Sequence, residues 1–109
     1  MSDVFELLQG TTPDLVVRIP SIIPVASIDK IELTFLHRSK KTILGNADVS
    51  LDAEENTITY VFPERFTLAL DPNQKMFWQL RLYVGNRVFG TKKKEISIED
   101  LISTEVLSG

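Results

Sequence analysis

The stretch "KMFWQLRLYVGNRVFGTKKKEISI", residues 75–98, carries the pattern that decides the fold. In its first half, apolar side chains occupy every second position and mixed side chains lie between them, which is typical of a β-strand with one buried face. Gly85-Asn86 interrupts this alternation, and both residue types accept the positive φ angles of a two-residue type I′ or II′ turn. The stretch therefore predicts a long hairpin whose return strand starts near Arg87.

The two faces of this hairpin differ in composition. The face expected in the core carries Met76, Trp78, Leu80, Leu82 and Val84. The opposite face carries Phe77, Gln79, Arg81 and Tyr83. Tyrosine and arginine are enriched at protein interfaces, so we interpret these four residues as a candidate interface. Burial of Phe77 beneath a loop of the same chain is an equally good alternative, because aromatic side chains are often covered.

Shorter segments outside the hairpin also alternate with a period of two. Strands are predicted within "DLVVRIP" (14–20), "KIELTFL" (30–36), "TILGN" (42–46), "DVSL" (48–51) and "TITYVF" (57–62). Several short strands separated by turn residues indicate a β-sandwich or a barrel. Two segments break the pattern: "PERFTLALDPNQ" (63–74) predicts one helical turn or a crossover, and "IPSIIP" (19–24) predicts a loop or a strand switch with Ile22 and Ile23 exposed.

Length and composition limit the possible classes of protein. A chain of 109 residues has room for one domain. We assign residues 1–98 to a β-sandwich domain and residues 99–109 to a last strand or a loosely tethered tail. The absence of cysteine excludes disulfides and thiolate chemistry. A net charge of −3 argues against nucleic acid and anionic membranes as partners, and we expect no membrane-spanning segment.

Candidate catalytic and metal-binding residues are few. His37 is the only histidine, and we interpret it as a surface residue at a strand end rather than as a base or a ligand. The acidic segment "DVSLDAEEN" (48–56) lacks the spacing of a calcium-binding loop and is expected to be a solvated turn. The glycines are scattered, so no phosphate-binding loop is predicted. We therefore assign no catalytic, cofactor-binding or metal-binding residue.

Two lysine clusters are predicted on hairpin strands. They are "SKK" (39–41) and "KKK" (92–94). The second cluster lies near Tyr83 and Phe89, and cations interleaved with rings can bind single-stranded nucleic acid. Lysines also protect sheet edges from pairing with other molecules, and in an acidic chain we favour this interpretation for both clusters.

Two longer segments carry a family resemblance. They are "FELLQGTTPDLVVRIP" (5–20), with its turn at Gln9-Gly10-Thr11-Thr12-Pro13, and "LALDPNQKMFWQLRLYVGNRV" (68–88), with its Asp71-Pro72 turn. Together they resemble small structural proteins from the tail and baseplate modules of phages and prophages of Gram-positive bacteria. The resemblance implies an all-β, single-domain, immunoglobulin-like antiparallel β-sandwich, similar to the N-terminal domain of baseplate upper proteins. It implies no catalytic residue and no cofactor.

The expected function follows from this resemblance. It is that of a non-enzymatic structural or adaptor protein of a phage particle, made in the bacterial cytoplasm and then part of the virion. Its partners would be other phage structural proteins or further copies of the chain, with no nucleic acid and no membrane. The sequence shows no long helical or receptor-binding extension, which argues against direct host attachment. A carbohydrate-binding β-sandwich with exposed aromatic rings is the alternative, and a small enzyme that uses His37 and a carboxylate ranks third.

Overall fold

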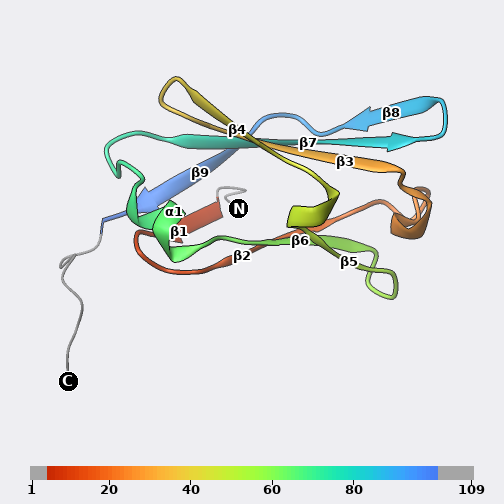
Figure 1. Ribbon diagram of the computed structural model, residues 1–109, viewed down its shortest axis with the longest axis horizontal. Coiled ribbons are helices and arrows are strands. Elements are labelled where there is room, and N and C mark those ends of the chain that lie inside the picture. Colours follow the sequence, from red (N-terminus) through yellow and green to blue (C-terminus); the bar gives the residue numbers. More distant parts are fainter. Residues whose placement is uncertain (1–4, 101–109) are drawn as a thin grey trace.

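The protein folds as two β-sheets stacked face to face, as the computed structural model in Figure 1 shows for residues 5–100. One sheet has six strands in the order β1-β9-β7-β3-β4, with β8 also paired to β7. The other sheet has three strands in the order β2-β6-β5. This arrangement confirms an all-β, single-domain fold with two sheets.

The predicted strands all occur, with short helical segments between them. The larger sheet consists of β1 (Phe5–Leu8), β3 (Lys30–His37), β4 (Lys40–Leu44), β7 (Met76–Val84), β8 (Arg87–Gly90) and β9 (Lys94–Glu99). The smaller sheet consists of β2 (Asp14–Arg18), β5 (Ser50–Asp52) and β6 (Thr57–Val61). The helical segments are η1 (Val25–Ser27), η2 (Asn46–Asp48) and α1 (Glu64–Leu68). The expected helical turn within residues 63–74 is therefore confirmed as α1.

The long hairpin forms as predicted, but its return strand is divided. Gly85 and Asn86 connect β7 to β8, and only Gly85 has a positive φ, of 56°, which fits a type II′ turn rather than a type I′ turn. β8 pairs with the last residues of β7, and β9 pairs with its first residues. Between them Thr91 continues the ladder: its N–H donates to the Leu80 carbonyl at 2.9 Å, and its Oγ1 accepts from the Leu80 N–H at 3.0 Å.

The expectation of a purely antiparallel sandwich is wrong at one strand pair. β1 runs parallel to β9, with Phe5 opposite Ile96 and Leu7 opposite Ile98. The reason is topological, because the chain leaves β1 in the larger sheet, turns at Gly10 (φ 77°) and enters β2 in the smaller sheet. β1 and β9 are far apart in sequence and need no hairpin between them.

The core fills the space between the two sheets and is rich in aromatic rings. Trp78 is buried, as predicted, and so are the apolar faces of β3 and β6. Phe62 has no exposed surface, and its ring centroid lies 5.0–6.0 Å from those of four other rings. These rings belong to Phe5, Phe35, Tyr60 and Phe66. The aromatic cluster therefore joins both sheets to α1.

The predicted loop at residues 19–24 is confirmed, and the side chain of Asn56 holds it. Ile22 is exposed, as expected, but Ile23 is buried, so the expectation for Ile23 was wrong. Asn56 Nδ2 donates to the carbonyls of Ile19 at 2.9 Å and Ile23 at 3.1 Å, and its Oδ1 accepts from the Val25 N–H at 2.8 Å. These bonds turn the backbone so that the Ile23 side chain enters the core.

At the C-terminal side, β9 continues to Glu99, one residue beyond the expected domain boundary at 98. The segment for which a last strand or a tail was expected falls mainly on residues 101–109, outside the described residues.

Candidate interaction surface

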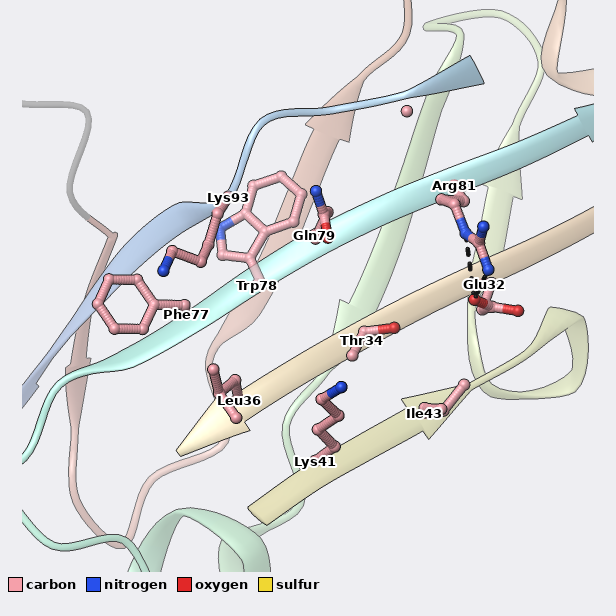
Figure 2. A pocket seen from close by; sticks show the side chains of 11 residues that line it. Glu32, Thr34, Leu36, Lys41, Ile43, Phe77, Trp78, Gln79, Arg81 and Lys93 are labelled. Carbon is pink, nitrogen blue, oxygen red and sulfur yellow. Dashed lines mark hydrogen bonds and ion pairs between the residues drawn. The ribbon is translucent and has the colours of Figure 1, made fainter. Parts of the chain in front are cut away.

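The outer face of the larger sheet carries the residues singled out from the hairpin. The register of β7 against β3 places Phe77 opposite Leu36, Gln79 opposite Thr34, and Arg81 opposite Glu32. β4 extends these rows with Lys41, opposite Leu36, and Ile43, opposite Thr34. Side chains from three neighbouring strands thus line a groove of about 440 Å³, which we call the outer-face groove (Figure 2).

At one end of the outer-face groove, a lysine ammonium lies over an apolar ring. Phe77 is half-buried and lies opposite Leu36. The ammonium of Lys93, from the connection between β8 and β9, lies 4.5 Å from the centroid of the Phe77 ring. The alternative prediction, that a loop of the same chain covers Phe77, is therefore confirmed in part, because one side chain of this connection lies over the ring. Phe77 and Lys93 together offer an apolar and a positively charged contact at one place.

The other end of the outer-face groove contains an ion pair. Arg81 Nη2 donates to Glu32 Oε1 at 2.7 Å, and Arg81 Nε donates to the same oxygen at 3.3 Å (Figure 2). The hydrogen bond from Arg81 lowers the pKa of the Glu32 carboxyl, with a smaller contribution from the positive charges of Arg81 and Lys30. The pair holds the guanidinium in place across β7 and β3, so Arg81 is oriented before any partner binds.

This ion pair predicts a pH dependence of stability. The pKa of Glu32 is lower in the folded chain than its ordinary value of 4.5, so the pair stabilises the fold above that pH. The stabilisation is lost as the pH falls through the lowered pKa. We expect the melting temperature of Glu32→Gln to lie below that of the wild type at pH 7 and the two melting temperatures to converge as the pH falls from 4.5 through the lowered pKa.

The matched control for this experiment is Glu54→Gln, which changes an exposed carboxylate in the turn between β5 and β6. Its melting temperature at pH 7 should stay close to that of the wild type, as for most surface substitutions. If the difference in melting temperature between the wild type and Glu32→Gln stayed the same from pH 7 down to about pH 3, the stabilisation would not depend on the ionised Glu32 carboxylate, which would contradict the prediction.

The middle of the outer-face groove contains both a polar and an apolar exposed side chain. Gln79 is exposed, and its Nε2 donates to the Thr91 carbonyl at 3.1 Å. Ile43 on β4 is 63% exposed, a high value for an isoleucine on a strand. The groove therefore combines an exposed aliphatic side chain with an amide that can form directed hydrogen bonds.

Tyr83 does not line the outer-face groove, although it lies on the same strand face. It is half-buried, and two cations flank its ring: Lys30 Nζ at 5.2 Å and the Arg81 guanidinium carbon at 5.7 Å from the centroid. The structure thus brings together Phe77, Gln79 and Arg81, and places Tyr83 beyond the ion pair.

Sequence reasoning missed the groove residues from the neighbouring elements. They are Glu32, Thr34, Leu36, Lys41, Ile43, Gly90 and Lys93. The alternation in "KIELTFL" already assigned the first three to one face, but no local signal states which strand lies beside β7. The lysines at 92–94 were expected on a hairpin strand, but only Lys94 lies in a strand, at the start of β9, whereas Lys92 and Lys93 lie in the connection between β8 and β9. Lys40 and Lys41 do lie on an edge strand, β4.

His37 and the acidic turn have roles in local structure. His37 Nε2 accepts the N–H of Asp71 at 3.2 Å, which fixes the start of the turn before β7. Asp52 Oδ1 accepts the N–H groups of Glu54 at 3.0 Å and Glu55 at 3.2 Å and closes the hairpin between β5 and β6. Within residues 5–100, no group of three or more acidic, histidine or cysteine side chains is placed to hold a metal ion.

Comparison with known proteins adds no relative. No protein-family model matches the chain, and no curated protein matches it at a significant level. In the described part of the chain, no helix has the length and apolar character needed to cross a membrane. The resemblance to phage tail and baseplate proteins therefore stays a prediction.

Proposed function

We propose that this protein is a non-enzymatic structural or adaptor module of a phage or prophage particle, which binds a protein partner through the outer-face groove. The observation that carries the proposal is the row of side chains across β7, β3 and β4. An aromatic ring, an oriented arginine and an exposed isoleucine lie along it, and these features are typical of interface centres. The tail or baseplate setting comes from the sequence resemblance.

We further propose that the sandwich is immunoglobulin-like. In that fold, strands B, E and D lie in one sheet and strands C, F and G in the other, with C′ beside C in variable-type domains. The order β2-β6-β5 corresponds to B-E-D, and the order β9-β7-β3-β4 corresponds to G-F-C-C′. Under this assignment the outer-face groove lies on the sheet that contains C, F and G.

Two observations favour binding of a protein partner in the groove over catalysis and over sugar binding. Glu32 is held as a carboxylate by Arg81, which makes it a poor proton donor. The ammonium of Lys93 lies 4.5 Å from the centroid of the Phe77 ring in the groove, so it competes with a sugar for stacking on that ring. A protein partner therefore ranks ahead of a carbohydrate.

Titration with a glycan panel, followed through tyrosine and phenylalanine resonances, tests the carbohydrate alternative.

Site-specific crosslinking tests the proposed partner class. A photo-reactive phenylalanine analogue at position 77 is expected to crosslink the chain to a structural protein that copurifies with particles induced from the source strain. The same analogue at the exposed Ser50 on β5, in the other sheet, serves as the control. The proposal fails if the chain is absent from purified particles or if both positions give the same products.

The affinity of the chain for the partner identified by crosslinking can then be measured. We expect Phe77→Ala and Arg81→Ala each to weaken binding by about 30-fold, as for interface residues that contribute about 2 kcal/mol. Isothermal titration calorimetry measures the change. Ser50→Ala, in the other sheet, should leave the affinity within about twofold of the wild type. Equal affinities for all the variants would contradict the assignment of the groove.

A further inference from the structure

One edge of the smaller sheet is open. In the described part of the chain, β2 pairs only with β6. The backbone N–H of Ile19 donates to the carbonyl of Asn56, and the carbonyl of Pro13 accepts from the N–H of Phe62. The backbone N–H and C=O groups of the odd-numbered residues of β2 therefore point toward β6. The backbone N–H and C=O groups of Asp14, Val16 and Arg18 consequently point away from the sheet.

An apolar groove lies directly beside this edge, between the two sheets. It has a volume of about 250 Å³ and opens along the second half of β2. Its walls include Val17 and Ile19 from the β2 side and Leu80, Leu82 and Phe89 from the larger sheet. We call this space the inter-sheet groove. It joins an apolar surface to a row of free backbone groups, which is the combination that added strands use in β-augmentation.

The open edge of β2 lacks the devices that protect other edges of this protein. β4 carries Lys40 and Lys41 on its edge, and β5 is only three residues long and precedes an acidic turn. β2 is five residues long and contains neither lysine nor proline. Val16, in its centre, is 53% exposed. Only the two ends of β2 carry charged residues, so the centre of this edge is suited to pairing with another strand.

The charges on β2 indicate the chemistry of the strand that fits. Asp14 and Arg18 lie at opposite ends and, with Val16, on the outer face of the smaller sheet. Arg18 has only a distant partner in its own chain, with Nη1 3.9 Å from Glu55 Oε2 and both side chains largely exposed. An incoming antiparallel strand would place one residue opposite Arg18 and another, four positions later, opposite Asp14. An acidic residue at the first and a basic residue at the second complement these charges.

We propose that the β2 edge and the inter-sheet groove form an acceptor site for an extended strand of another protein chain. The strand runs antiparallel to β2, has apolar residues at the alternate positions that face the groove, and carries an acidic residue opposite Arg18 and a basic residue opposite Asp14. Gly90 lines both this site and the outer-face groove, but the two share no other lining residue, and the site does not depend on the function proposed for the outer-face groove.

A designed peptide tests this site on the full-length chain. The peptide is the blocked hexapeptide Ile-Asp-Val-Thr-Val-Arg. Its isoleucine and first valine lie opposite Ile19 and Val17 and face the inter-sheet groove. Its aspartate lies opposite Arg18, its threonine opposite Val16 and its arginine opposite Asp14. Titration into ¹⁵N- and methyl-labelled protein is expected to shift the amides of Asp14, Val16 and Arg18 and the methyl groups of Leu80 and Leu82.

Matched peptides separate strand pairing from general adhesion. Methylation of the threonine nitrogen removes the N–H that faces β2 and should weaken binding at least about tenfold. Exchange of the aspartate and the arginine places like charges together and should weaken it about fivefold. Both peptides leave the protein unchanged, so neither result depends on the folding of a variant.

A protein variant gives a second readout. Val16→Pro removes one N–H at the open edge and leaves the ladder to β6 intact, because residue 16 faces away from β6. It should melt within a few degrees of the wild type and bind the hexapeptide at least about tenfold more weakly. The proposal is overturned if the hexapeptide causes no shifts at about 2 mM, a generous limit for a weak site. It is equally overturned if the methylated peptide binds as well, or if the shifts map to the outer-face groove.

Discussion

Replacement of Phe62 by alanine is expected to lower the free energy of unfolding by about 3–5 kcal/mol, the usual cost of a large cavity at a buried phenylalanine. Phe62 has no exposed surface and packs against four rings from β1, β3, β6 and α1. Domains of this size have total stabilities of about 5–15 kcal/mol, so the loss approaches the lower end of that range. Urea denaturation followed by tryptophan fluorescence, which reports on Trp78, measures it.

Two variants control this experiment. Phe62→Leu keeps most of the volume and should cost about 1–2 kcal/mol, because less of the cavity remains. Phe77→Ala removes a half-buried ring from the outer face and should cost clearly less than Phe62→Ala, because part of the Phe77 ring is exposed to solvent. A loss below about 1 kcal/mol for Phe62→Ala would contradict the central place of Phe62 in the core.

Replacement of Asn56 by alanine is expected to lower the free energy of unfolding by about 2–4 kcal/mol, from lost hydrogen bonds and an unfavourable backbone angle. Asn56 has a φ of 55°, in the left-handed region that asparagine tolerates better than alanine. Its side chain also satisfies the N–H of Val25 and the carbonyls of Ile19 and Ile23. Thermal and urea denaturation measure the loss, and faster amide exchange of Val25 locates it.

Glycine at the same position separates the two causes. Asn56→Gly removes the side-chain hydrogen bonds but accepts the positive φ, so it should be more stable than Asn56→Ala by about 1 kcal/mol. Ile19 and Ile23 line the inter-sheet groove, and both substitutions should therefore also weaken binding of the hexapeptide. Equal stability of the wild type and Asn56→Ala would show that the loop at residues 19–25 is held by its apolar packing alone.

Local patterns predicted most of the secondary structure. Alternation in "KIELTFL" and "TITYVF" identified β3 and β6 together with their buried faces, because a strand with one dry face requires a period of two. The Gly85-Asn86 turn identified the hairpin, because few residue types accept a positive φ. The same local patterns placed Trp78 in the core and Phe77, Gln79 and Arg81 on the opposite face.

The candidate sites could be predicted only in part. Three of the four residues chosen from β7 line the outer-face groove, but the choice contained no residue of β3 or β4. The inter-sheet groove was not predicted, because it depends on which strand edge stays open. Lys93 was assigned to an edge, whereas it covers Phe77, because the break between β8 and β9 brings it back over β7.

The amino-acid sequence alone determined the all-β class, the strand positions, the long hairpin and which face of β7 points away from the core. Each of these depends on interactions between residues close together in the chain, such as side-chain alternation and turn geometry. Only the tertiary structure decided the parallel pairing of β1 with β9, the Glu32–Arg81 pair across β3 and β7, and the open edge of β2. These features depend on strands that are distant in sequence. Their pairing is selected by burial of the shared core, which no short segment encodes.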